Sequence, residues 1–287
     1  MLKHLNWNKI KANLICTIAV IFFAFGFPAA EALLLDWGIL SILAIRNILA
    51  FLIIFLIWFF WEGKVVIKIT QVWRGIYIGA IGFGIGSSLL VVAQYLTNSV
   101  TAALAAAMMP LAGVVLEVLL DNRRLTKWFF FGALSVILGG VVSLGLEILN
   151  SQLGIGAIVG FFSATIFAWG SRQTTKGLPD VSYLSQTLIT TFGMLLFSVV
   201  VLSISSLFES TTSKIPNFKF EYIYLIIVYS CFGLALSQTL WIKAVGELGI
   251  GVASFHMNAT PFFVMIIVYL MGANWSWSQL GGVTLVV

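Results

Sequence analysis

Ten stretches of apolar residues run along this chain, separated by short polar links. A helix that crosses a bilayer needs roughly 20 mostly apolar residues, so each stretch predicts a membrane-spanning helix. The predicted helices cover residues 12–34, 38–60, 74–94, 98–119, 128–146, 153–170, 181–207, 222–242, 250–271 and 276–287. The last stretch is short, because its length at the helical rise gives only about 18 Å. The expected fold class is an all-α polytopic membrane protein.

Residues 82–110 recur as residues 233–261 when the sequence is shifted by 151 positions. The matched pairs are Gly82 with Gly233, Leu89 with Leu240, Ala93 with Ala244, Ala102 with Ala253 and Pro110 with Pro261, and after a two-residue slip Trp128 with Trp277 and Gly132 with Gly281. This pattern predicts two five-helix repeats, 1–147 and 148–287, which together form one integrated transport domain. Because five is an odd number, the second repeat is expected to be inverted relative to the first, as in many secondary transporters.

The basic residues predict the orientation of the helices. One side of the membrane receives Lys3, Lys9, Lys11, Lys64, Lys68, Arg74, Arg123, Arg124, Lys127, Arg172, Lys176 and Lys243, and the other receives only Lys214 and Lys219. The positive-inside rule then places both termini in the cytoplasm, and the expected location is a cell inner (cytoplasmic) membrane. A cleaved signal peptide ending near Ala30-Glu31-Ala32 is the competing interpretation, but the first apolar run is longer than such peptides carry.

Composition restricts the class of protein further. The chain of 287 residues is 61% hydrophobic and 9% charged, which leaves no room for a sizeable soluble domain. The net charge of +5 is attributed to membrane topology, and no nucleic-acid partner is expected. Two separate cysteines, Cys16 and Cys231, predict buried thiols. No catalytic or phosphate-binding motif occurs, so neither an enzyme nor a cofactor is expected, and a secondary carrier is favoured over an ATP-driven pump.

Polar groups inside apolar helices are the candidate binding residues, because burying them without a partner is costly. Arg46 lies roughly 12 Å into its helix by helical rise. It either holds helices together through carbonyl or carboxylate partners, or contacts an anionic substrate group. Ser87 and Gln94 share one face of the third predicted helix.

The second repeat carries more such groups. Gln238 and Trp241 are three residues apart and share a face, and Ser254 shares a face with Asn258, whereas His256 points away from that pair. Together with Trp169 these residues predict a cavity in which indoles form apolar walls and amides orient a polar group. The alternatives are an interfacial aromatic belt for the tryptophans and interhelical hydrogen bonds for the amides.

Two prolines are candidate hinges, and two carboxylates are candidates to carry a coupling proton. Pro110 and Pro261 each remove a backbone hydrogen bond at mid-helix, which predicts either a hinge or a static kink. Glu117 and Glu31 are the candidates to carry a coupling proton. A surface ion pair with Arg123 or Arg124 is the alternative for Glu117.

Several of these residues give the chain a resemblance to the EamA-type branch of the drug/metabolite transporter superfamily. They are Phe25-Gly26, Arg46, Ala93 and Pro110 in the first half, and Trp169-Gly170, Ala244, Pro261 and residues 277–282 in the second. The resemblance covers nearly the whole chain and implies metabolite transport, most often efflux.

The expected function is alternating-access export of a small organic metabolite, with amino acids or related amphipathic compounds as the first candidates. Broad export of cationic or lipophilic drugs is the runner-up, and it is weakened because no acidic residue is expected at mid-membrane to neutralise a cation. A non-transporting scaffold or receptor remains a further alternative. The expected partners are the small-molecule substrate, the lipid bilayer and a coupling proton, and both a monomer and a homodimer stay open.

Overall fold

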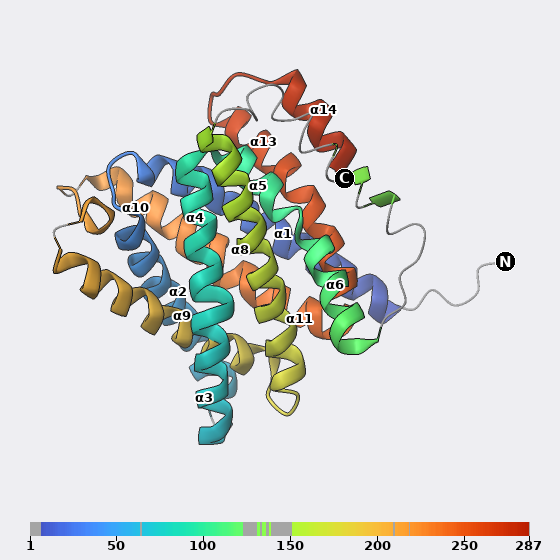
Figure 1. Cartoon of the computed structure of the whole chain (residues 1–287). Helices are drawn as coiled ribbons and strands as arrows, with labels where there is room; N and C mark the ends of the chain where they lie inside the picture. The colour runs from blue at the N-terminus through green and yellow to red at the C-terminus, as the bar shows by residue number, and fades with distance from the viewer. Residues whose placement is uncertain are drawn as a thin grey trace.

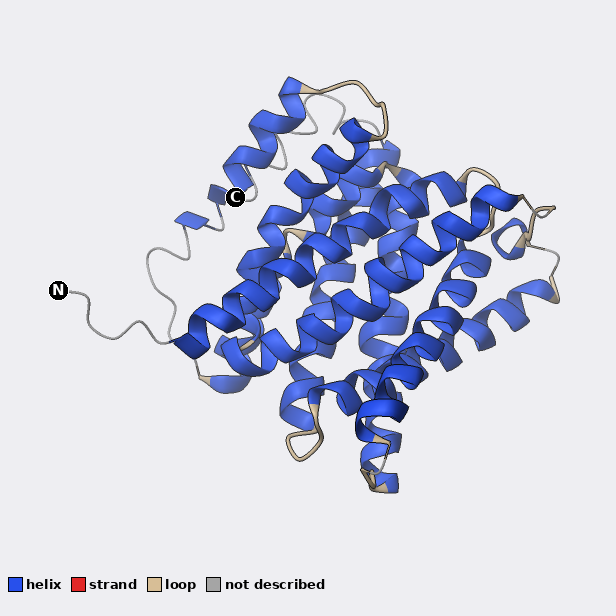
Figure 2. Ribbon diagram, turned by 180° about the vertical axis from the view of Figure 1, so that it is seen from behind, coloured by secondary structure: helices blue, strands red, loops and turns tan. Residues whose placement is uncertain are grey.

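The computed structural model describes residues 7–63, 65–122, 131–132, 134–135, 138, 151–208, 210–217 and 219–286. These residues form helices joined by short links, and no strand occurs among them (Figures 1 and 2). Eight helices within this part of the chain are long and apolar enough to cross a membrane. They confirm eight of the ten predicted spans. The predicted helix 128–146 falls almost wholly outside the described residues, so the total of ten stays a prediction.

The helical elements have the following bounds. The first half contains α1 (Trp7–Leu34), α2 (Ile39–Glu62), α3 (Ile69–Ile78), η1 (Gly79–Ile85), α4 (Gly86–Leu96), α5 (Ser99–Ala106) and α6 (Met109–Asp121). The second half contains α8 (Ser151–Gly177), α9 (Tyr183–Ser206), η3 (Thr211–Ser213), α10 (Phe220–Ile227), η4 (Val228–Leu236), α11 (Ser237–Leu248), α12 (Ile250–Ala253), η5 (Ser254–Ala259), α13 (Thr260–Leu270) and α14 (Trp277–Val286). Unbroken spans run from α3 through α4 and from α10 through α11.

Irregular segments recur at the same 151-residue offset as the sequence match. The π-helical segments η1 and η4 end at Ile85 and Leu236, which are 151 residues apart. The helices α5 and α12 begin 151 residues apart, as do α6 and α13. π-Helical turns are rare and are often found at functional sites, so their matched placement is not expected by chance. The 151-residue offset of the sequence match therefore also relates elements of the backbone.

The two matched prolines do not kink a continuous α-helix, which corrects the prediction from the sequence. The helix is already interrupted before each of them, by the turn at residues 107–108 and by the 3₁₀ segment η5. Pro110 and Pro261 then stand in the first turn of α6 and of α13. A proline is tolerated there because the first backbone N–H groups of a helix have no partner within that helix.

Close glycine contacts bring the two halves together. A Cβ added to Gly233 would lie 2.8 Å from the Cα of Gly26, and one added to Gly170 would lie 2.7 Å from the Cα of Gly82. The backbone of α1 thus touches η4, and that of α8 touches η1. Figure 1 shows α8 running beside α4. The first helix of each half packs against the third span of the other half.

The links between helices lie at two opposite ends of the helices, and polar contacts join them there. At one end the backbone N–H of Gly38 donates to the Lys214 carbonyl (2.8 Å), and Lys219 donates to Asp36 (2.9 Å). At the other end Ser185 donates to Glu62 (2.9 Å), and Arg172 pairs with Asp121 (2.6 Å). The second end carries most of the described basic residues, and we call it the basic end.

The helices at the basic end are longer than predicted. Arg74, Arg172, Lys176 and Lys243 lie inside helices, where the sequence pattern put links or helix ends. Helical hydrogen bonding does not stop where apolar residues stop, and long basic side chains reach water from within a helix.

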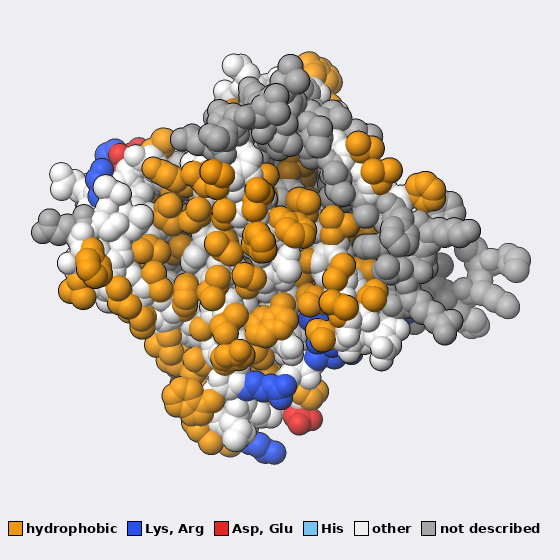
Figure 3. All heavy atoms as spheres, viewed as in Figure 1, with side chains coloured by type: hydrophobic (Ala, Val, Ile, Leu, Met, Phe, Trp, Pro, Cys, Tyr) orange, Lys and Arg blue, Asp and Glu red, His pale blue; other side chains and the backbone are white. Residues whose placement is uncertain are grey.

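The lateral surface is strongly apolar. Figure 3 shows hydrophobic side chains covering the middle of one face, with Lys and Arg near its edges. Leu52, Phe59, Ile158, Phe162 and Val200 are all more than two-fifths exposed. An apolar belt of this extent is what contact with lipid requires.

Candidate functional site

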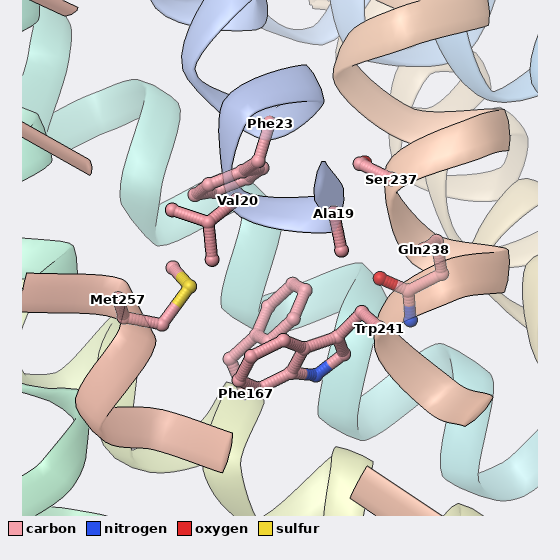
Figure 4. A pocket seen from close by; sticks show the side chains of 8 residues that line it. All are labelled: Ala19, Val20, Phe23, Phe167, Ser237, Gln238, Trp241 and Met257. Atoms are coloured by element: carbon pink, nitrogen blue, oxygen red, sulfur yellow. The ribbon is translucent and has the colours of Figure 1, made fainter. Parts of the chain in front are cut away.

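A small space, here called the inner cavity, lies between α1, α8, α11 and η5. Its lining is Ala19, Val20, Phe23, Phe167, Ser237, Gln238, Trp241 and Met257 (Figure 4). In Figure 4 the Trp241 indole and the Phe167 ring lie side by side, with the Met257 thioether facing them. The cavity volume is about 20 Å³, which is enough for about one water molecule. The described conformation therefore holds this space nearly closed.

A second space, here called the outer cavity, lies on the other side of Phe23. Its lining is Phe23, Gly26, Phe27, Arg46, Leu90, Val91, Gln94, Tyr229 and Gly233. Its volume is also about 20 Å³. Phe23 lines both cavities, so the two spaces are neighbours.

The basic end opens into a much larger polar space, here called the cleft. Its volume is about 570 Å³, and its lining includes Glu117, Asp121, Arg172, Lys176 and Gln186. Tyr183, Val245 and Gly246 also line this cleft. A large polar cleft thus lies at the basic end, and two small cavities that share Phe23 lie between the helices.

Trp241 and Gln238 both lie in the inner cavity, as their shared helical face predicts. The indole N–H of Trp241 donates to Ser171 Oγ (2.9 Å), which in turn donates to the Phe167 carbonyl (2.8 Å). These two hydrogen bonds fix the Trp241 indole as one wall of the inner cavity. Gln238 is 5% exposed, and its Nε2 has no hydrogen-bond partner in the described structure. A buried amide without a partner for its N–H₂ group can bind an acceptor on a ligand.

Arg46 lies in the outer cavity and is 5% exposed. Its Nη1 donates to the Tyr229 hydroxyl (3.0 Å) and its Nε donates to Asn47 Oδ1 (3.0 Å). The guanidinium carbon also lies 4.8 Å from the centroid of the Tyr229 ring. The Nη2 atom is buried without a partner.

Gln94 also lines the outer cavity, whereas Ser87 lies outside both cavities. Gln94 Nε2 donates to the Phe27 carbonyl (2.6 Å) and to Ser99 Oγ (3.1 Å). Ser87 donates to the carbonyl of Gly84 (3.3 Å) in its own helix.

Asn258 and His256 are close to the inner cavity in sequence but do not line it. Both lie in the 3₁₀ segment η5, where Met257 faces the cavity instead. A 3₁₀ helix has three residues per turn, so the face that Ser254 and Asn258 would share in an α-helix is lost. Asn258 Oδ1 and His256 Nδ1 are buried without a hydrogen-bond partner.

Trp169 lies away from both cavities. Its ring packs edge-to-face against Tyr77, with the centroids 6.4 Å apart, and Tyr77 is largely exposed. Two positions along an α-helix correspond to a rotation of about 200°, so Phe167 faces the inner cavity whereas Trp169 faces Tyr77.

Glu31 and Glu117 occupy matching places at opposite ends of the helices. Glu31 accepts hydrogen bonds from the backbone N–H of Ser99 (2.9 Å) and from its hydroxyl, at the start of α5. Glu117 accepts from the backbone N–H of Gly251 (2.8 Å), at the start of α12. Each carboxylate therefore lies at a helix N-terminus, which attracts negative charge. The alternative ion pair of Glu117 with Arg123 or Arg124 falls on residues outside the described part of the chain.

Most lining residues of the two cavities were not predicted from the sequence, among them Phe23, Phe167, Tyr229 and Met257. They are aromatic or apolar side chains in apolar helices, where nothing distinguishes an inward position from a lipid-facing one. Arg46 was the one signal in the sequence for a polar lining residue such as Tyr229, because a buried charge needs a polar partner. Within the described residues, no group of three or more His, Cys, Asp or Glu side chains could hold a metal ion.

Long apolar helices around enclosed cavities define a polytopic membrane protein. Residues 10–145 match the EamA-like transporter family, which confirms the resemblance. Residues 10–145 are therefore an EamA-like domain, and that family is one of membrane transporters. One solved crystal structure is 16% identical with a TM-score of 0.73, and the match covers 96% of this chain and 94% of that chain, which shows a shared fold. No curated protein matches the sequence.

Proposed function

We propose that this transporter moves small organic metabolites with an apolar body and a polar group, such as amino acids, out of the cytoplasm by alternating access. The observation that carries this proposal is the presence of three spaces among the helices. A cleft of about 570 Å³ opens at the basic end, and two cavities of about 20 Å³ follow on either side of Phe23. Alternating access would widen the two small cavities and join them to one side of the membrane at a time.

Support for two inverted five-helix repeats, 1–147 and 148–287, comes from where equivalent links lie. The link before α5 is held by Glu31 near the end that carries Asp36 and Lys214. Its equivalent before α12 lies in the cleft at the basic end, beside Glu117. Equivalent links at opposite ends are expected if one repeat is upside down relative to the other, as in many secondary transporters.

The interrupted helices supply candidate hinges. Residues 107–108 and the segment η5 precede Pro110 and Pro261, and the second of these interruptions carries Met257 in the inner cavity. Backbone rotation at η5 would therefore change the cavity wall directly. We assign hinge roles to Pro110 and Pro261 on this ground.

We also propose an orientation in the membrane and an energy source for transport. The basic end faces the cytoplasm, with both termini on that side of an inner membrane. Glu31 and Glu117 are the proposed proton carriers, because protonation would remove the charge that holds the starts of α5 and α12. The described site is built from one chain, which fits a monomer as well as a homodimer.

Counterflow of labelled amino acids in proteoliposomes tests the proposed function. Gln238→Ala and Trp241→Ala should each lower the affinity or the rate of exchange. Unchanged exchange in both variants would contradict the cavity assignment. Export of cationic drugs is a weaker candidate, since neither cavity has an acidic residue in its described lining.

A further inference from the structure

The guanidinium of Arg46 is a buried charge without a counter-ion. Its side chain is 5% exposed, and no carboxylate among the described residues forms a salt bridge with it. Its contacts are the neutral oxygens of Tyr229 and Asn47. An uncompensated buried charge is strongly destabilising, so such a group is usually paired when the site is filled.

Neighbouring side chains hold this guanidinium in one orientation. Asn47 Oδ1 accepts from Nε, and the amide of Asn47 contacts the Met194 carbonyl (3.5 Å). Tyr229 accepts from Nη1 and lies under the guanidinium carbon at 4.8 Å. Nη2 is left without a partner. The guanidinium is thus positioned before any ligand arrives.

Tyr229 adds a second donor at the same place. A hydroxyl group donates one hydrogen bond and accepts others. Because the Tyr229 oxygen accepts from Arg46, its own proton remains for a ligand, and no acceptor for it occurs among the described residues. Both residues line the outer cavity. A guanidinium N–H and a phenol O–H from two residues that line one cavity suit the two oxygens of a carboxylate.

We infer that the outer cavity is a carboxylate subsite, and that the transported metabolite is a monocarboxylate with an apolar body. This inference rests on the proposed transport function and narrows its substrate class. The apolar body would lie against Phe167, Trp241 and Met257 after the inner cavity, about 20 Å³ as described, has widened. Phe23 separates the two subsites, so its side chain must turn aside when one ligand fills both.

Charge decides against the other ligand classes. A phosphate ester carries about two negative charges near neutral pH, whereas Arg46 is the only Lys or Arg in the described lining of either cavity. A cation would meet the unpaired charge of Arg46 with no acidic residue in those linings to offset it.

Three ligands of similar shape test the inference: benzoate, benzamide and benzylamine. The measurement is the thermal unfolding temperature of the purified full chain in detergent, with each compound at equal concentration. Benzoate should raise the Tm, and benzamide and benzylamine should leave it unchanged. Arg46→Met should abolish the benzoate shift, and Tyr229→Phe should weaken benzoate binding by about tenfold or more. Trp169→Ala, outside both cavities, is the matched control and should keep the full shift.

An equal shift with benzamide, a shift with benzylamine alone, or no shift with any of the three would overturn the inference. So would a full benzoate shift in Arg46→Met. If that variant fails to fold, Tyr229→Phe decides, because full benzoate affinity there is equally contradictory. The binding measurement needs no transport. Counterflow without benzoate binding would therefore overturn the inference alone, whereas benzoate binding without counterflow would contradict only the proposed function.

Discussion

Gly82 and Gly170 meet backbone to backbone, so that a Cβ on Gly170 would lie 2.7 Å from the Cα of Gly82. Gly26 and Gly233 make the same kind of contact between α1 and η4. In each of the two contacts, the first helix of one half touches the π-helical segment of the other half. Small residues allow such approaches between membrane helices.

Adding a methyl group at this contact should destabilise the protein. Gly170→Ala is expected to lower the free energy of unfolding by about 1–3 kcal/mol, because the backbone of η1 must move to make room. Gly233→Ala should lower the free energy of unfolding by a similar amount. The measurement is thermal unfolding in detergent. Gly281→Ala is the control, because a Cβ there meets nothing within 4 Å. Equal stability of Gly170→Ala and Gly281→Ala would contradict the packing described.

Two tryptophans allow a matched test of the inner cavity. Trp241→Ala removes a cavity wall and its hydrogen bond to Ser171, so the rate or the affinity of counterflow should fall at least tenfold, roughly the effect of losing a buried aromatic contact. Trp169→Ala removes an indole of the same size from a position beside Tyr77, outside both cavities. It should retain transport. A larger loss in Trp169→Ala than in Trp241→Ala would reverse the assignment.

Substituting Pro261 distinguishes a hinge that moves during transport from a static break in the helix. Pro261→Ala should change the free energy of unfolding by less than about 1 kcal/mol, because Pro261 stands in the first turn of α13. If η5 moves during transport, the same variant should slow turnover. Pro216→Ala, in the link before α10, is the control for proline loss. Full turnover in Pro261→Ala would indicate a static break.

Much of this architecture could be predicted from the apolar runs, because lipid demands long apolar helices whatever else a chain does. Eight spans and the shared cavity position of Gln238 and Trp241 follow from residue spacing alone. The position of Met257 could not be predicted, since it depends on a 3₁₀ segment that changes the helical period from about 3.6 to 3.0. Nor could that of Phe167, because tertiary packing decides which face of α8 turns inward.

Asp36 gives a prediction for pH. Hydrogen bonds from Tyr222 and Lys219 hold the pKa of the Asp36 carboxyl below its ordinary value. A lowered pKa in the folded state contributes stability above the unfolded value of about 3.9, and this contribution is lost as the pH falls through the folded pKa. Asp36→Asn should therefore be less stable than wild type at pH 7.

The difference between wild type and Asp36→Asn should shrink once the pH falls below about 4. Thermal unfolding in detergent across that range measures it. Glu221→Gln is the control for loss of a single surface charge, since its carboxylate lies 3.8 Å from Lys219. A difference that grows toward low pH would contradict the sign.

Inversion of the two halves is the central claim, and the equivalent links before α5 and α12 test it most directly. Thr97→Cys and Glu247→Cys place single thiols beside these links, in a chain that also carries Cys16→Ala and Cys231→Ala. A membrane-impermeant maleimide should label Thr97→Cys from the outside of intact cells and Glu247→Cys only in inside-out vesicles. Labelling of both thiols from the same side would contradict the inverted arrangement.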